Sequence, residues 1–323
     1  MLQGAMLVWF ILTLLSVVFV IWDSVTNGVT SWVQRTGWIL VTIYTGPIGA
    51  FMYLMACRRP FPGGHDRFTE STWKQGVNSE VHCLAGDATG IIIASAIVPA
   101  FALANGWDIL IEYSAGFVTG LFIFQALMML GMYSGNYLEA VRKTFFAETV
   151  SMNMVMLGMI PVMVILAALW PDSMSPARPE FWFRMSLASV VGGIVAFPVN
   201  CWLVKDHLKH GCMTLPGADV PAPGLGHRSA EPAMMHEMAM VHEPDQGQHH
   251  QMHGQPMHGQ HAGSPAGMEM SHEESGHGAA QESHAMKMRE LPLGVSVLWI
   301  FGTYAFLIAA IWLTAQWVPI SFS

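Results

Sequence analysis

Potential metal ligands are concentrated in the segment from Glu80 to Gly90. Cys83 and Asp87 are four residues apart, and His82 directly precedes Cys83. Residues four apart share one face of a helix, so the thiol and the carboxylate should lie together. An apolar run from Ile91 to Ala104 follows, which places these side chains at or just inside the mouth of a membrane helix. Ionisable residues there usually face a bundle interior or an ion path, whereas the alternative is a polar helix mouth solvated by water.

A second group of sulfur and imidazole side chains follows a later apolar run. Thiolates and imidazoles are ligands for soft transition metals, so this group would complete a metal site if its helix touches the helix of Cys83. The alternative is an ordinary basic helix end, with Lys205 and Lys209 close to anionic lipid. The four candidate ligands are Cys201, His207, His210 and Cys212.

A histidine- and methionine-rich loop precedes the last apolar run. Residues 213–290 contain eleven of the 15 histidines and eleven of the 25 methionines, without any aromatic residue or isoleucine. This composition buries too little apolar surface to offset chain entropy, so we expect disorder from about 214 to 288. Histidine-rich tracts bind copper, zinc or nickel, and interleaved thioethers favour copper(I); the alternative is a polar spacer. The candidate ligands are His249, His250, Met252, His253, Met257, His258 and His261.

Methionines recur at helical spacing in one apolar run, at Met152, Met156, Met159 and Met163. Met128 and Met132 repeat the four-residue step in the preceding run. Such a stripe serves more often as adaptable packing than as a set of ligands, and a thioether path for a metal is the alternative.

The whole composition is that of a polytopic membrane protein, with 53% hydrophobic and 11% charged residues. We predict an all-α bundle of about seven transmembrane helices, formed by a six-helix domain at 1–212, the disordered loop at 213–290 and a last helix in 291–323. The second helix contains Gly46-Pro47, which predicts a kink. The expected helices span roughly 4–22, 37–57, 82–104, 114–134, 150–170, 183–204 and 293–317.

Basic residues predict the orientation. With seven helices, one side carries Arg35, Arg178 and Arg184, and the other side carries the remaining eleven of the 14 lysines and arginines. The positive-inside rule then places the N-terminus and the histidine- and methionine-rich loop in the cytoplasm, and the C-terminus outside. We expect a multi-pass protein of the inner (cytoplasmic) membrane. Its four cysteines would face a reducing compartment as free thiols.

Three motifs resemble a bacterial and archaeal membrane family known only as a domain of unknown function. The first is an aromatic Tyr-x-Gly-Pro helix, and the second is a Trp followed by His-Cys-x-x-Gly at a helix start. The third is Pro-Val-Asn-x-Trp-Leu near a helix end. The resemblance spans roughly residues 5–212 and implies a membrane fold without an established activity; many relatives have a second cysteine at the position of Asp87. The matching residues are Tyr44, Gly46 and Pro47, then Trp73, His82, Cys83 and Gly86, then Pro198, Val199, Asn200, Trp202 and Leu203.

The patterns favour handling of soft transition metals, copper first, by transport or homeostasis. A non-transporting scaffold or assembly factor, whose loop binds metal or a partner, is the alternative. A membrane redox enzyme ranks lowest, because the membrane runs are almost free of histidine. We find no catalytic motif and no basic, aromatic-rich patch for nucleic acid. Membrane lipid and metal ions are the expected partners, and a homo-oligomer or a membrane-protein partner is compatible with the sequence.

Overall fold

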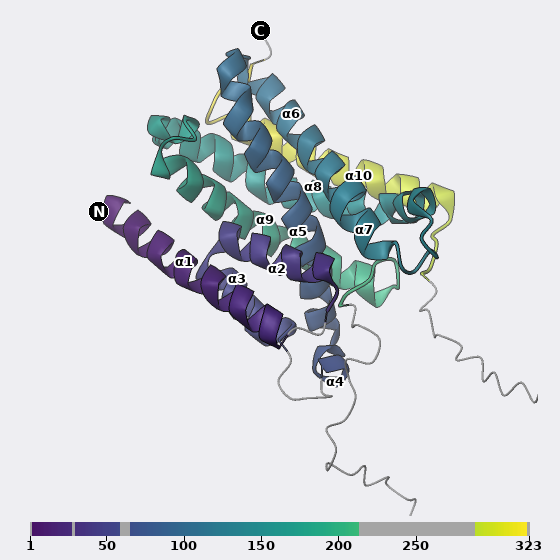
Figure 1. Ribbon diagram of the computed structural model, residues 1–323. Helices are drawn as coiled ribbons and strands as arrows, with labels where there is room; N and C mark the ends of the chain where they lie inside the picture. Colours follow the sequence, from purple (N-terminus) through teal and green to yellow (C-terminus); the bar gives the residue numbers. More distant parts are fainter. Residues whose placement is uncertain (1, 28–29, 59–64, 213–287, 322–323) are drawn as a thin grey trace, which may run out of the picture. The chain divides into compact units, whose positions relative to one another are not determined.

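The computed structural model describes residues 2–27, 30–58, 65–212 and 288–321, all of which belong to one compact unit (Figure 1). The described residues form helices and loops and contain no strand. The longer helices are α1 (Leu2–Thr26), α2 (Trp32–Thr45), α3 (Pro47–Ala56), α5 (Thr72–Ile97), α6 (Asn105–Val118), α8 (Tyr137–Leu169), α9 (Pro179–Lys205) and α10 (Leu293–Ala315). The shorter ones are α4 (His65–Thr69), α7 (Ala126–Met129), the 3₁₀-helices η1 (Val98–Phe101) and η3 (Pro171–Met174), and the π-helix η2 (Thr119–Gln125).

Six segments of the described chain are long and apolar enough to cross a membrane. This confirms the predicted all-α, polytopic class. α5 continues into η1, and α6, η2 and α7 together form one segment of 24 residues. The six segments are Leu2–Thr26, Thr72–Phe101, Gly106–Met129, Tyr137–Leu169, Pro179–Lys205 and Leu293–Ala315.

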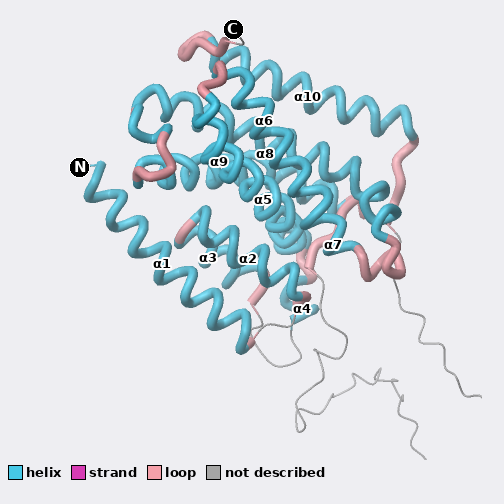
Figure 2. The backbone as a smooth tube through the Cα atoms, turned by 45° about the horizontal axis from the view of Figure 1, so that its top comes forward, coloured by secondary structure: helices cyan, strands magenta, loops and turns pink. Residues whose placement is uncertain are grey.

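The second expected transmembrane helix, 37–57, is instead a helical hairpin made of α2 and α3 (Figure 2). The chain reverses at Gly46, whose φ of 61° and ψ of −136° strongly favour glycine. The rings of Trp38 and Tyr53 lie 5.5 Å apart across the hairpin. In a continuous helix these two residues would be separated by about 22 Å. The Gly46-Pro47 pair therefore makes a turn and not the kink that the sequence suggested.

Both ends of the hairpin are fixed to the same level of α5. Gln34 donates from Nε2 to Asn78 Oδ1 at 3.1 Å, and Asn78 donates from Nδ2 to the carbonyl of Ala56 at 2.8 Å. Asp23, at the end of α1, accepts hydrogen bonds from Tyr53 and Arg58. The hairpin thus enters and leaves at one end of the bundle. The expected seventh crossing is absent from the described chain, and the first and last described residues, Leu2 and Ser321, lie at the end opposite Cys212 and Met288.

Helix α5 is the centre of the bundle and contacts α2, α3, α6, α8 and α9 (Figure 1). Most of its residues are buried, polar ones included. Small residues allow the other helices to come close: a Cβ on Gly158 of α8 would lie 2.8 Å from the Cα of Gly192 on α9. Helix α10 packs mainly on α8 and leaves much of its surface exposed, as expected for a lipid-facing helix.

The turn at Gly46 should not tolerate a side chain. A Cβ there would lie 2.6 Å from Thr13 Oγ1 on α1, in addition to the unfavourable φ. We expect Gly46→Ala to lower the free energy of unfolding by about 1–3 kcal/mol, measured by denaturant titration in detergent micelles. Gly302→Ala is the control, because that glycine in α10 has no atom within 4 Å of its Cβ position. Equal stability of the two variants would contradict the hairpin geometry.

The hairpin also predicts the sidedness of its flanks. Trp32 is exposed at the start of α2, Arg58 follows α3, and Gln3 is exposed near the start of α1. A cysteine introduced at Trp32 should react with a membrane-impermeant maleimide from the same side as one introduced at Arg58, and from the side opposite one at Gln3. Labelling is compared with the native cysteines as background. If the Trp32 and Arg58 positions react from opposite sides, residues 37–57 cross the membrane and the hairpin is wrong.

Candidate metal centre between α5 and α8

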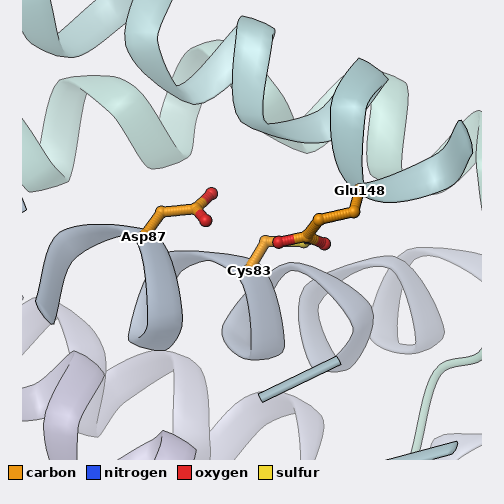
Figure 3. A group of neighbouring side chains, drawn as sticks. All are labelled: Cys83, Asp87 and Glu148. Carbon is orange, nitrogen blue, oxygen red and sulfur yellow. The ribbon is translucent and has the colours of Figure 1, made fainter. Parts of the chain in front are cut away.

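Cys83 and Asp87 project from one face of α5 towards Glu148 of α8 (Figure 3). All three residues are fully buried, and one ligand atom from each lies within 4.8 Å of the others. The Cys83 thiol donates to Glu148 Oε2 at 2.6 Å. The predicted shared face of Cys83 and Asp87 is therefore present, and its third member comes from α8.

Two glycines allow this cluster to form. Gly86 of α5 touches Gly120 of η2 so closely that a Cβ on Gly86 would lie 2.6 Å from the Cα of Gly120. A Cβ on Gly120 would overlap Asp87 Oδ1 and Glu148 Oε1. Gly120 belongs to a π-helix, and π-helical turns are frequent at functional sites. The π-helical turn therefore presents a surface without side chains to the two carboxylates.

A buried lysine closes the cluster from the chain that follows α9. Lys209 donates from Nζ to Cys83 Sγ at 2.7 Å and to Asn200 Oδ1 at 2.8 Å, and Ser151 Oγ lies 3.4 Å away. Its side chain is buried, which contradicts the alternative interpretation of Lys209 as part of a basic helix end close to anionic lipid. Burial lowers the pKa of Lys209, but the adjacent Cys83, Glu148 and Asp87 outweigh burial and raise this pKa above its ordinary value.

Several oxygens of the cluster remain without a donor. Both Asp87 oxygens and Glu148 Oε1 are buried and have no hydrogen-bond partner within the described part of the chain. Buried polar atoms normally have a partner, so these three acceptors indicate that the cluster holds a proton or a cation. Three acidic groups also face a single ammonium. Thiolate and carboxylate are both zinc and transition-metal ligands.

The geometry requires adjustment before a metal ion is bound. Two ligands of one tetrahedral ion lie about 3.5 Å apart, compared with the 4.8 Å limit that the three atoms satisfy. The Lys209 amine also contacts the sulfur that would coordinate the ion. An ion therefore enters only if this amine moves away from Cys83.

The other ligands predicted near Cys83 lie elsewhere. α5 and α9 do touch, but Cys201 packs against Gly76, seven residues before Cys83. His82 is buried with Nε2 at 3.4 Å from the carbonyl of Gly211, and its Nδ1 has no partner among the described residues. Neither Cys201 nor His82 joins Asp87 and Glu148.

The remaining predicted ligands lie along the segment that follows α9. Cys212 Sγ lies 3.1 Å from Nε2 of His65, a buried histidine on α4. His207 is exposed in a turn with a φ of 57°, and burial lowers the pKa of the half-buried His210, with a further contribution from His207. Within the described ranges, Cys83, Asp87 and Glu148 form the one set of at least three such ligands close enough for a single ion. We refer to these three residues as the Cys83 group.

The predicted ligands of the loop lie outside the described residues. They are His249, His250, Met252, His253, Met257, His258 and His261. Their role in metal binding stays a prediction.

The residues that build the cluster all fall within one region of the chain, from Cys83 to Lys209. Residues 72–209 match a family model described as a domain of unknown function (DUF4396). The DUF4396 segment contains Cys83, Asp87, Gly120 and Glu148. It leaves out the hairpin, α10 and the histidine- and methionine-rich loop, and it is shorter than the expected 5–212. No curated protein and no solved structure is found to match the chain.

Two members of the cluster were not predicted from the sequence. Glu148 stands four residues before Met152 of the methionine stripe, and this shared face was a signal that could have placed it in the bundle. Lys209 had no comparable signal, because a lysine after a helix end usually faces solvent or lipid headgroups. Both are in the DUF4396 segment.

Removal of the Lys209 charge should destabilise the protein. Lys209→Met leaves the Cys83–Glu148 pair without its cation, and we expect a loss of about 3–5 kcal/mol in the free energy of unfolding. Lys205→Met is the matched control, because Lys205 is exposed at the end of α9 and should change stability by less than about 1 kcal/mol. Denaturant titration in micelles measures both. Adding Glu148→Gln to Lys209→Met should recover part of the loss; equal effects of the two lysine variants would contradict the buried ammonium.

Proposed function

We propose that this membrane protein transports soft transition-metal ions, copper first, through a site formed by Cys83, Asp87 and Glu148. The observation that carries the proposal is the set of buried carboxylate oxygens without donors beside a thiol, in the middle of a helical bundle. Polar groups at such depth are costly and typically belong to ion or proton pathways.

The arrangement of basic residues supports an orientation. Because the hairpin returns to its starting end, Arg35 lies at the end of the bundle where α9 leads into the loop. Among the described residues, two arginines, Arg178 and Arg184, remain at the other end, against nine basic residues at the loop end. The positive-inside rule then favours a cytoplasmic loop and two external termini. The N-terminus thus moves to the outside relative to the expectation from seven helices.

The loop would supply ions to the buried site. It starts directly after Cys212, only four residues from Lys209, and its histidines and methionines are suited to loose, multi-site binding of copper. Displacement of the Lys209 amine by an incoming ion would keep a positive charge next to Cys83 and Glu148 throughout. This exchange avoids an uncompensated anionic cluster in the bundle.

Metal content and flux test the proposal. We expect purified full-length protein to bind copper, and a variant lacking 214–288 to lose the loop ions but keep those held in the bundle. Cys83→Ser should reduce copper flux into proteoliposomes by about tenfold to a hundredfold or more. Loss of a residue that only supports a metal ligand typically costs this much, and Cys83 would be a ligand itself. Cys201→Ser is the control, because Cys201 packs against Gly76 outside the cluster.

Elemental analysis and a fluorescent copper indicator inside the vesicles give the two readouts. Unchanged flux in Cys83→Ser would contradict the site. Bound metal without flux of copper, zinc or nickel would contradict transport and favour a scaffold that holds or delivers metal.

A further inference from the structure

Five side chains share one face of α8. Glu148, Met152, Met156, Met159 and Met163 follow each other in steps of four, four, three and four residues. At 100° per residue they fall within an arc of about 80°. All four methionines are buried, the most exposed at 5%. We refer to these four methionines as the methionine face.

One end of the methionine face touches the Cys83 group. Glu148 belongs to this group and lies one turn before Met152. A Cβ on Gly116 of α6 would lie 2.8 Å from Met152 Cε and 3.1 Å from the backbone oxygen of Asp87. The thioether of Met152 therefore lies beside the turn of α5 that carries Asp87.

The other end of the methionine face reaches a cavity of about 300 Å³. Met163 lines this cavity, together with Asp108 and Glu112 of α6 and Arg184 of α9. A second thioether, Met174 of η3, lines it as well and accepts a hydrogen bond from Arg184 Nη1 at 3.2 Å. Two carboxyl groups against one guanidinium make the cavity formally negative, which suits a cation.

The methionine face has the dimensions of a path between these two sites. From Glu148 to Met163 α8 rises about 22 Å, and neighbours on one face are about 5–6 Å apart at Cβ. Flexible thioether side chains can bring successive sulfurs within reach of one ion. Neutral thioethers bind copper(I) and contribute little to zinc or nickel binding.

We propose that the methionine face of α8 is a copper(I) path that connects the Cys83 group with the cavity of Asp108, Glu112 and Met163. The inference rests on the proposed transport function and names its substrate. The Cys83 group itself accepts several metals, since thiolate and carboxylate ligands suit zinc as well as copper. Selection for copper(I) would come from the thioethers beyond it.

The competing role of these side chains is packing. Met159 lies against Gly192 at the contact of α8 and α9, where a Cβ would be 2.6 Å from Met159 Cγ. Leucine has a similar volume and polarity and replaces methionine in cores with small effects, but it has no sulfur. Methionine-to-leucine substitutions therefore separate packing from metal binding.

Full-length protein in proteoliposomes provides the test, with copper(I), its surrogate silver(I), and zinc as probes. We expect Met156→Leu, and more strongly Met156→Leu with Met159→Leu, to reduce copper(I) and silver(I) flux at least tenfold, without changing the melting temperature or any zinc flux. Met154→Leu is the control, because Met154 is half-buried and lies off the methionine face of the same helix. It should transport copper(I) like the wild type.

The outcomes separate the two proposals. If the double leucine variant transports copper(I) as fast as the wild type, the path is overturned and the transport function still stands. An equal loss for zinc, or an equal loss in Met154→Leu, would assign the effect to packing and also overturn the path. Wild-type vesicles that move none of the three ions would overturn the transport function and the path together.

Discussion

The buried ammonium of Lys209 is the constraint on which the middle of the bundle depends. A lone positive charge among apolar helices would cost several kcal/mol, so the thiol and carboxylates must lie within reach. They reach it only because α5 and α8 converge on Gly120, where the absence of a side chain leaves room for two carboxylates. Asn200 and Ser151 satisfy the remaining donors of the amine. One set of polar contacts therefore links α5, α8, α9 and the chain after α9.

Much of the architecture could be predicted, because it follows from local properties of the sequence. Long apolar runs identify membrane helices, and the four-residue spacing of Cys83 and Asp87 places them on one face. The hairpin could not be predicted in the same way. The stretch 37–56 is largely apolar, and whether Gly46-Pro47 bends or reverses a helix depends on Asn78, Asp23 and Thr13, which are distant in sequence.

The site shows the same limit. Spacing within one helix identified two of the three acidic members of the cluster, but partners from other helices depend on how the helices rotate about their axes. Cys201 is on the helix that touches α5, yet it meets Gly76 and not Cys83. Lys209 is fixed by the turn after α9, where His207 adopts a positive φ and redirects the chain towards the bundle. Nothing in the local sequence signals that reversal.

The hairpin of α2 and α3 affects more than its own neighbourhood. The hairpin leaves the membrane on the side where it entered, so it contributes no crossing. The direction in which every later helix crosses the membrane is therefore set by α1 alone. The DUF4396 segment itself contains four crossing segments, an even number, and both of its ends emerge on one side. A helix added after this core leaves its direction unchanged, whereas a single crossing added before it requires the N-terminus to change sides. The hairpin thus adds two helices before the core while the buried site keeps its direction relative to the two compartments.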